Sequence, residues 1–296
     1  MVINTLSICL PRGCNAKCPF CISKLTTVGE QSKLTEDSIK YDHNFMKVCR
    51  LAQIGGISSV LITGKGEPLL YPNLIDHALF NLREDFDFPF IDLQTNGLIL
   101  FEKMDDEIWN NRLDGWWFQG LTTISISVAH YDPIRNSQIY TPGGRYMSIP
   151  MLVQYLHKHR FQVRLNCTLV KDYIDSVEEV LAFIRWCKEI DVDQVSIRPV
   201  RSPAIGENKE VYEWTKAHEL SDYTINKIHA FFEKNATPWF KFAHGAIAYD
   251  YEGMNVCLTD CLTRQHERPE ELRQVILMPD GSIAADWALK GAKLLR

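Results

Sequence analysis

Strand-like and helix-like segments alternate along the first two-thirds of this chain. Apolar runs typical of strands cover residues 3–10, 59–63, 90–95, 122–128, 162–170 and 194–200. Segments with apolar residues at helical spacing cover residues 36–54, 73–83, 102–112, 146–160 and 176–190. Because repeated strand–helix units give parallel strands joined by right-handed crossovers, the sequence predicts an α/β fold. Six units are too few for a closed eight-stranded barrel, so we expect a partial (β/α)6 TIM-like barrel over residues 1–200.

The pattern changes in residues 201–296, which we expect to form a C-terminal α+β extension. A helix is predicted over residues 220–234, and residues 240–251 indicate a strand or an edge hairpin. Residues 274–285 hold two apolar runs around Asp280 and Gly281, which is a hairpin signal. We expect this extension to form one compact unit with the barrel, to close it and to shape the substrate pocket.

Composition favours a soluble, cytoplasmic protein. No apolar run approaches the roughly eighteen residues of a membrane span, and we expect no targeting peptide before the first strand. A net charge of −5 gives no electrostatic reason to expect nucleic acid as a partner. Nine cysteines, an odd number, argue against a disulfide framework and fit a reducing compartment.

Three of these cysteines lie within eight residues, directly after the first predicted strand. Cys14, Cys18 and Cys21 have the spacing C-x3-C-x2-C. Three thiolates on a four-iron, four-sulfur cluster leave one iron without a protein ligand, and a small molecule can bind there and receive electrons. A zinc site remains an alternative, although structural zinc takes four ligands and no paired ligand motif lies nearby.

Three further motifs follow in order at the ends of later predicted strands. They are Gly-Lys-Gly-Glu-Pro at residues 64–68, Thr-Asn-Gly at 95–97 and Thr-Ile-Ser-Ile-Ser-Val at 123–128. Together with the cysteine loop, the set resembles the radical S-adenosylmethionine (SAM) superfamily over roughly the first 200 residues. The family commonly has Gly-Gly-Glu-Pro, and here Lys65 stands in place of the first glycine while the Gly-Glu-Pro core is intact.

The resemblance implies a [4Fe-4S] cluster held by Cys14, Cys18 and Cys21, with SAM bound at its open iron. Reduction by a donor such as flavodoxin or ferredoxin would split SAM into methionine and a 5′-deoxyadenosyl radical. That radical would abstract hydrogen from the substrate. The implied SAM contacts are Phe20 for the adenine, Gly64, Gly66 and Glu67 for the amine, and Asn96, Ser127, Asn166 and Arg198 for the ribose and carboxylate.

The substrate is left open by the sequence. We expect a small molecule, such as a nucleotide or sugar. A peptide-modifying enzyme or epimerase is an alternative, and a non-catalytic metal- or cluster-binding protein is an alternative of another class. Charged candidates for substrate binding are Arg145, Arg198, Arg201 and Lys209, and His130, Tyr131, Asp132 and Trp287 are further candidates near the pocket.

Cys257 and Cys261 in the extension have three open interpretations. They are structural thiols, ligands of a second cluster, or hydrogen donors to a substrate radical. The other cysteines lie among apolar residues, as expected for small buried side chains.

Overall fold

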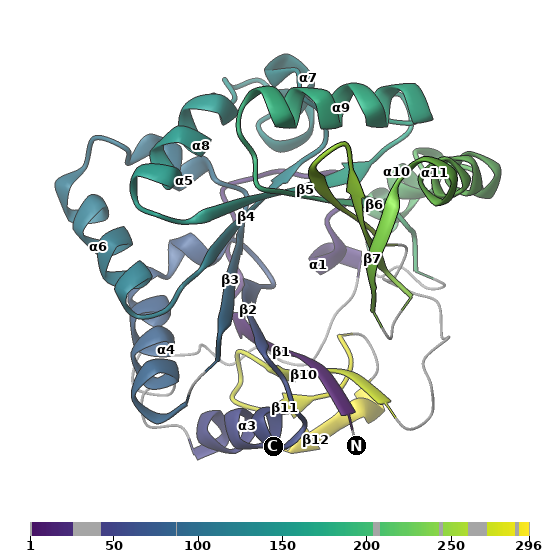
Figure 1. Ribbon diagram of the computed structural model, residues 1–296. Coiled ribbons are helices and arrows are strands. Elements are labelled where there is room, and N and C mark those ends of the chain that lie inside the picture. The colour runs from purple at the N-terminus through teal and green to yellow at the C-terminus, as the bar shows by residue number, and fades with distance from the viewer. Residues whose placement is uncertain are drawn as a thin grey trace.

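The computed structural model describes residues 2–25, 43–86, 88–203, 208–242, 245–259, 271–287 and 290–295. Six parallel strands form the centre of one sheet, which curves inside a ring of helices (Figure 1). They are β1 (Val2–Leu10), β2 (Ser59–Gly64), β3 (Phe90–Thr95), β4 (Thr123–Val128), β5 (Gln162–Leu169) and β6 (Gln194–Pro199). Each strand pairs in parallel with the next along the chain, so the predicted partial barrel is confirmed.

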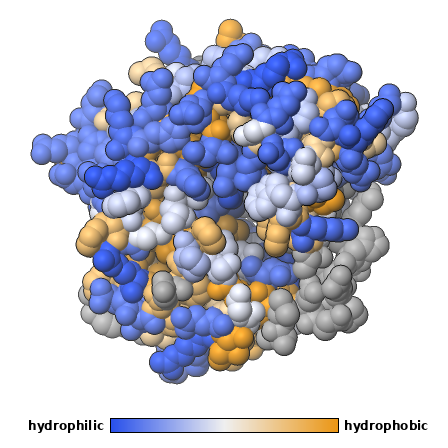
Figure 2. All heavy atoms as spheres, in the orientation of Figure 1, coloured by the Kyte–Doolittle hydropathy of each residue, from blue (hydrophilic) through white to orange (hydrophobic). Residues whose placement is uncertain are grey.

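Helices cover the outer face of this sheet (Figure 1). They include α3 (His43–Ile54), α4 (Pro72–Asp85), α6 (Glu107–Phe118), α8 (Ile149–Lys158) and α9 (Val177–Glu189). Side chains alternate between the two faces of a strand, and the outward set, such as Ile62, Ile126 and Leu165, is fully buried under the helices. Hydrophilic residues gather over α7 (Pro133–Tyr140), α8 and α9 on the solvent side of the same layer (Figure 2). None of the helices in the described ranges is long and apolar enough to cross a membrane.

The helices differ from the prediction in one divided segment and in helices that were not predicted. The segment predicted at residues 102–112 is two helices, α5 (Leu98–Glu102) and α6, because the Asp106 carboxylate accepts hydrogen bonds from the amides of Ile108 and Trp109. A further helix, α7 (Pro133–Tyr140), was not predicted. Asp132 caps it and Pro133 occupies its first turn, a start signal visible in the sequence. The extension likewise holds an unpredicted helix, α10 (Lys209–Ala217), before the predicted one, α11 (Asp222–Asn235).

The C-terminal strands extend the sheet at both edges. On one side β9 (Met254–Leu258) pairs in parallel with β6, and β8 (Ile247–Tyr251) and β7 (Thr237–Lys241) follow antiparallel. On the other side β10 (Glu271–Leu277) pairs in parallel with β1, followed by β11 (Ile283–Ala284) and β12 (Lys293–Leu295). Both predicted hairpins are confirmed by the antiparallel pairs β7–β8 and β10–β11. Within the described residues the sheet is open, with β12 and β7 at its two ends.

The inner face of the sheet, which points away from the helices, is polar. Ser125, Arg164 and Gln194 lie there in register on β4, β5 and β6, and Asp92 on β3 is in register with Thr123 on β4. Ser127 is in register with Asn166, which is in register with Ser196 on β6. The helix-facing side of the sheet is apolar, so the hydrophobic core lies between the sheet and the helices. The polar inner face is therefore the side that can bind ligands.

Candidate active site

The cysteine loop begins where β1 ends and finishes in the short helix α1 (Ile22–Leu25). The amides of Lys24 and Leu25 donate to the carbonyl oxygen of Cys21, so α1 holds the last cysteine in place. The sulfur of Cys14 accepts hydrogen bonds from the Ala16 amide at 3.4 Å and from Asn96 Nδ2 at 3.8 Å. The same two N–H groups can donate to Cys14 when it is a thiolate.

The three thiols are close enough for the charge of one to affect the pKa of another. Burial, followed by the neighbouring thiols of Cys21 and Cys14, raises the pKa of Cys18 to about 12. Burial also raises the pKa of Cys14. A strong positive charge, such as that of bound iron, opposes these two rises and favours the thiolate forms of Cys14 and Cys18. In the described ranges no three His, Cys, Asp or Glu side chains converge as ligands of one ion. In a [4Fe-4S] cluster each cysteine binds a different iron. The three cysteines therefore fit such a cluster although they do not surround one ion.

The loop after β2 lies directly against the cysteine loop. The Glu67 amide donates a 2.6 Å hydrogen bond to the Gly13 carbonyl oxygen, and the Lys65 amide donates to Leu10 at 3.3 Å. A Cβ placed on Gly66 would lie only 1.9 Å from that same Gly13 oxygen. Gly66 is therefore required by a backbone contact, which brings the two loops together as one unit.

The carboxylate of Glu67 is fully engaged inside the protein. Its side chain is 2% exposed and accepts hydrogen bonds from the Leu69 amide at 3.1 Å, Thr95 Oγ1 at 2.6 Å and the Asn96 amide at 2.8 Å. Burial raises the pKa of Glu67 to about 6, and the three donors oppose that rise. Glu67 thus ties the loop after β2 to the end of β3.

Asn96 joins the end of β3 to the cysteine loop. Its Nδ2 donates a 2.7 Å hydrogen bond to Asn15 Oδ1, and its Oδ1 accepts from the Leu98 amide at 3.0 Å, at the start of α5. The loops after β1, β2 and β3 are consequently connected by hydrogen bonds at one edge of the sheet, as expected for the carboxyl ends of parallel strands.

The remaining predicted SAM contacts lie on the inner face or beside the cysteine loop. Ser127 and Asn166 are registered neighbours near the ends of β4 and β5, and Arg198 is in register with Thr168. Phe20 is partly buried, with its ring centroid 5.9 Å from that of Trp214 on α10. The fold therefore gathers all the predicted residues at or near the carboxyl ends of β1–β6.

A family model described as the Radical SAM superfamily matches residues 8–201 of the chain. That range runs from β1 to the end of β6 and contains every residue of the site described above. The chain belongs to the radical SAM superfamily. Members of this superfamily are enzymes that use a [4Fe-4S] cluster and SAM, which are accordingly the cofactors assigned to this chain.

Curated relatives carry the name GTP 3′,8-cyclase. One from Clostridium perfringens (strain 13 / Type A) is 24% identical over 208 residues, which are 70% of this chain and 58% of the relative. One from Alkaliphilus metalliredigens (strain QYMF) is 25% identical over 223 residues, 75% of this chain and 62% of the relative. This radical SAM chain thus spans less than two-thirds of the length of these relatives.

Two solved structures share the fold over nearly the whole chain. Streptococcus suis SuiB bound to precursor peptide SuiA has a TM-score of 0.61 at 17% identity, covering 96% of this chain and 59% of SuiB. Native anSMEcpe with bound AdoMet and Kp18Cys peptide has a TM-score of 0.60 at 14% identity, covering 99% of this chain and 77% of that one. At such identities the similarity concerns the fold alone.

The inner face of this radical SAM fold also carries a charged cluster that sequence reasoning missed. Arg164 Nη1 donates a 2.6 Å hydrogen bond to Asp92 Oδ2, and Arg164 Nε and Nη2 donate to Gln194 Oε1 at 2.9 and 2.6 Å. Burial raises the pKa of Asp92, and Arg164 opposes the rise. The available signal was a charged residue at an inward position in each of two strands whose outward residues are apolar.

Several other candidates have structural partners. The Nδ1 atom of His130 accepts from the Asp132 amide, Asp132 caps α7, and the Tyr131 hydroxyl donates to Glu179 on α9 at 3.3 Å. These three residues therefore connect β4, α7 and α9, and none of these hydrogen bonds joins them to the cysteine loop. Arg145 and Lys209 are exposed.

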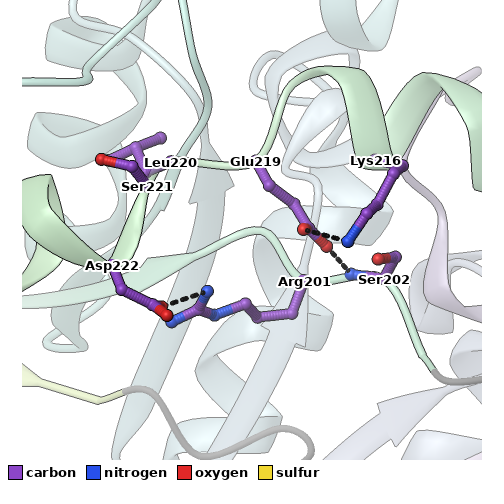
Figure 3. A pocket seen from close by; sticks show the side chains of 7 residues that line it. All are labelled: Arg201, Ser202, Lys216, Glu219, Leu220, Ser221 and Asp222. Carbon is purple, nitrogen blue, oxygen red and sulfur yellow. Dashed lines mark hydrogen bonds and ion pairs between the residues drawn. The ribbon is translucent and has the colours of Figure 1, made fainter.

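Arg201 lines a separate polar cavity of about 380 Å³ between the loop after β6 and the α10–α11 turn (Figure 3). Its guanidinium points toward Asp222, with an N–O distance of 3.2 Å, while Glu219 accepts from Lys216 and from the Ser202 amide. None of the residues that line that cavity belongs to the predicted SAM site.

Lys65, where the chain departs from the family pattern, is buried beside the C-terminal extension. Its ammonium lies 5.6 Å from the centroid of the Trp287 ring, and burial lowers its pKa. Trp287 in turn donates to Gln274 Oε1 on β10 at 3.0 Å. Cys257 lies on β9 in register with Ser196, on the inner face, and Cys261 lies outside the described residues.

Proposed function

We propose that this chain is a radical SAM enzyme that holds a [4Fe-4S] cluster with Cys14, Cys18 and Cys21 and acts on a small-molecule substrate. When bound, the cluster supplies an electron that splits SAM and yields a 5′-deoxyadenosyl radical for hydrogen abstraction. The observation that carries the proposal is the backbone contact between Gly13 and Gly66. That contact places the three-cysteine loop and the Gly-Glu-Pro loop in one rigid unit at the carboxyl edge of the sheet.

In this proposal Gly64 and Gly66 bind the SAM amine through their backbone, whereas Glu67 holds them in position. The Glu67 carboxylate already accepts three hydrogen bonds from protein donors. Its side chain has little capacity left for a ligand, but it fixes the loop that presents the glycines. Glu67 is therefore a positioning residue for SAM.

The inner face supplies the other proposed SAM contacts. Asn96, Ser127, Asn166 and Arg198 are the proposed contacts to the ribose and carboxylate, and Phe20 is the proposed contact to the adenine. The guanidinium of Arg198 suits a carboxylate because it carries a permanent charge and several N–H donors. Neighbouring strands hold these groups at fixed spacing, so the ligand meets preorganised donors.

A small, polar substrate fits the inner face best. Arg164, Gln194 and Asp92 place charged and amide groups there, and polar groups at defined positions orient small molecules. The relatives named GTP 3′,8-cyclase favour a nucleotide among such molecules. The peptide-bound states of SuiB and anSMEcpe favour a peptide-modifying enzyme as the second candidate, at identities too low to transfer a substrate.

The proposal includes a flavodoxin- or ferredoxin-type electron donor and a reducing, cytoplasmic location. All eight cysteines in the described part of the chain are free thiols, which suits such a location.

The test is anaerobic reconstitution with iron and sulfide, followed by reduction with dithionite and assay of 5′-deoxyadenosine from SAM. Wild type should take up iron and form 5′-deoxyadenosine, and Cys18→Ala should do neither. Cys49→Ala, at a buried thiol on α3, is the matched control and should keep the iron. Full iron and activity in Cys18→Ala, or zinc uptake in place of iron, would refute the assignment. Comparing nucleoside triphosphates with peptides as substrates then separates the two candidates, and a precursor-peptide reading frame next to the gene would favour the second.

A further inference from the structure

Two tyrosine hydroxyls are buried next to the cysteine loop without a hydrogen-bond partner. Tyr140 ends α7 and is 2% exposed, and Tyr146 lies in the connection to α8. Their ring centroids are 5.9 Å apart. Among the described residues neither hydroxyl oxygen has a donor or acceptor within hydrogen-bond distance. Most buried hydroxyls in proteins are hydrogen-bonded, so this pair requires an explanation.

Both tyrosines pack on the segment that carries the cysteines. Tyr140 and Tyr146 belong to an apolar cluster that also contains Ala16, Cys18 and Phe20. The carbonyl oxygen of Tyr140 accepts a 3.0 Å hydrogen bond from the amide of Lys17, between the first two cysteines. The end of α7 is thereby attached to the cysteine loop, and the position of the Tyr140 ring relative to Cys18 is fixed.

Cys18 is the proposed cluster ligand that packs in the same apolar cluster as both tyrosines. Neither hydroxyl is hydrogen-bonded to the Cys18 sulfur itself. The missing acceptor therefore belongs next to Cys18, where the proposed function places the cluster.

We propose that the Tyr140 and Tyr146 hydroxyls donate hydrogen bonds to sulfur atoms of the [4Fe-4S] cluster beside Cys18 and thereby raise its reduction potential. The inference rests on the proposed function, because the acceptors are sulfur atoms of that cluster. One-electron reduction adds a negative charge that is shared with the sulfurs. A donor O–H stabilises this reduced form more than the oxidised form, so the potential rises.

Phenylalanine variants remove each oxygen and keep the ring. Tyr140→Phe and Tyr146→Phe are prepared singly and together, reconstituted with iron and sulfide, and titrated anaerobically with EPR detection of the reduced cluster. We expect each variant to keep its iron and to be about tenfold harder to reduce, a shift of about 59 mV to more negative potential for one electron. The double variant should show a larger shift than either single one.

Tyr155→Phe is the matched control. Its hydroxyl donates a 2.7 Å hydrogen bond to Asn110 Oδ1, between α8 and α6. Removing that oxygen should leave the potential unchanged and lower the melting temperature of the apoprotein. Tyr140→Phe and Tyr146→Phe should show the opposite pattern, with an unchanged or higher apoprotein melting temperature, because their oxygens have no partner in the polypeptide.

The outcomes separate this inference from the proposed function. A wild-type protein that takes up no iron would overturn both. Unchanged potentials in fully loaded Tyr140→Phe and Tyr146→Phe would overturn this inference and leave the proposed function intact. Weaker SAM binding with an unchanged potential would assign the hydroxyls to SAM and would equally overturn it.

Discussion

The amide of Glu67 donates a 2.6 Å hydrogen bond to the carbonyl oxygen of Gly13, across 54 residues of sequence (67 − 13). This single bond joins the loop that follows β2 to the loop that carries the cysteines. It forms only because Gly66 has no side chain, since a Cβ there would overlap Gly13. Four predictions follow from this junction and from the sheet beneath it.

Gly66→Ala should separate the two loops. The added methyl group meets the Gly13 oxygen at 1.9 Å and the Gly13 nitrogen at 2.6 Å, and backbone atoms cannot rotate away as a side chain can. We expect iron uptake to fall at least about tenfold, with a free-energy loss of the order of 1–3 kcal/mol typical of overpacking. Gly115→Ala on α6 is the control, because a Cβ there meets nothing within 4 Å. Normal iron content in Gly66→Ala would show that the junction is not required.

Glu67→Ala should retain the cluster and weaken SAM binding. The variant leaves the Thr95 hydroxyl and two amides without their acceptor, which loosens the glycine loop but not the cysteines. We expect a rise in the SAM dissociation constant of about tenfold or more, equivalent to about 1.4 kcal/mol. Equilibrium binding to the iron-loaded protein measures it, with the exposed acid Glu107 replaced by alanine as control. Loss of iron with unchanged SAM affinity per cluster would contradict the assignment.

The stability of the apoprotein should depend on the protonation of Glu67. Its folded-state pKa of about 6 exceeds the ordinary value of 4.5, so the folded state binds this proton more tightly than the unfolded chain does. The corresponding stabilisation is present below pH 4.5 and is lost as pH rises through 6. It amounts to about 2 kcal/mol.

Urea unfolding of wild type and Glu67→Gln between about pH 4 and about pH 8 tests this. The glutamine does not titrate, so other groups cancel in the difference between the two proteins. The free energy of unfolding of wild type should fall relative to that of Glu67→Gln as pH rises through 6. A difference independent of pH would show that the carboxyl is not perturbed.

Arg164→Met should destabilise the barrel from its inner face. Asp92 is 4% exposed, and the variant removes its cationic partner. We expect a loss of about 3 kcal/mol in the free energy of unfolding at neutral pH, because a buried charge without its partner is costly. The double variant Asp92→Asn/Arg164→Met should recover most of the free energy of unfolding that Arg164→Met loses. If the two single effects simply add in the double variant, the pair makes no coupled contribution.

The sequence predicted strands well and long-range contacts poorly. The bounds of β1–β6 agree with the predicted runs within about a residue. The signal for each strand is local, because its outward apolar residues form a pattern that can be read without knowing the rest of the fold. The loops of the site were also found, because parallel strands of one sheet end at the same edge. Whether Phe20, Ser127, Asn166 and Arg198 contact SAM stays a prediction.

The unpredicted features depend on residues distant in the chain. Glu67 appeared as a SAM ligand in its motif, whereas its acceptor role depends on Thr95 and Asn96 at the next strand's end. Tyr140 and Tyr146 had no motif, and only the packing of α7 on the cysteine loop reveals them. The break between α5 and α6 depends on a single N-cap at Asp106. The apolar periodicity continues across this residue and therefore does not indicate the break.

The pairing of β10 with β1 has a consequence for the order in which the protein is made. Val2 to Ile8 pair with Glu271 to Leu277, so the strand that leads into the cysteine loop keeps one open edge until β10 has been synthesised. Such late, non-local closure is slow compared with local helix formation. The cysteine loop is thus synthesised well before the strand that completes the sheet beside it, so the proposed cluster ligands precede that part of the fold during synthesis.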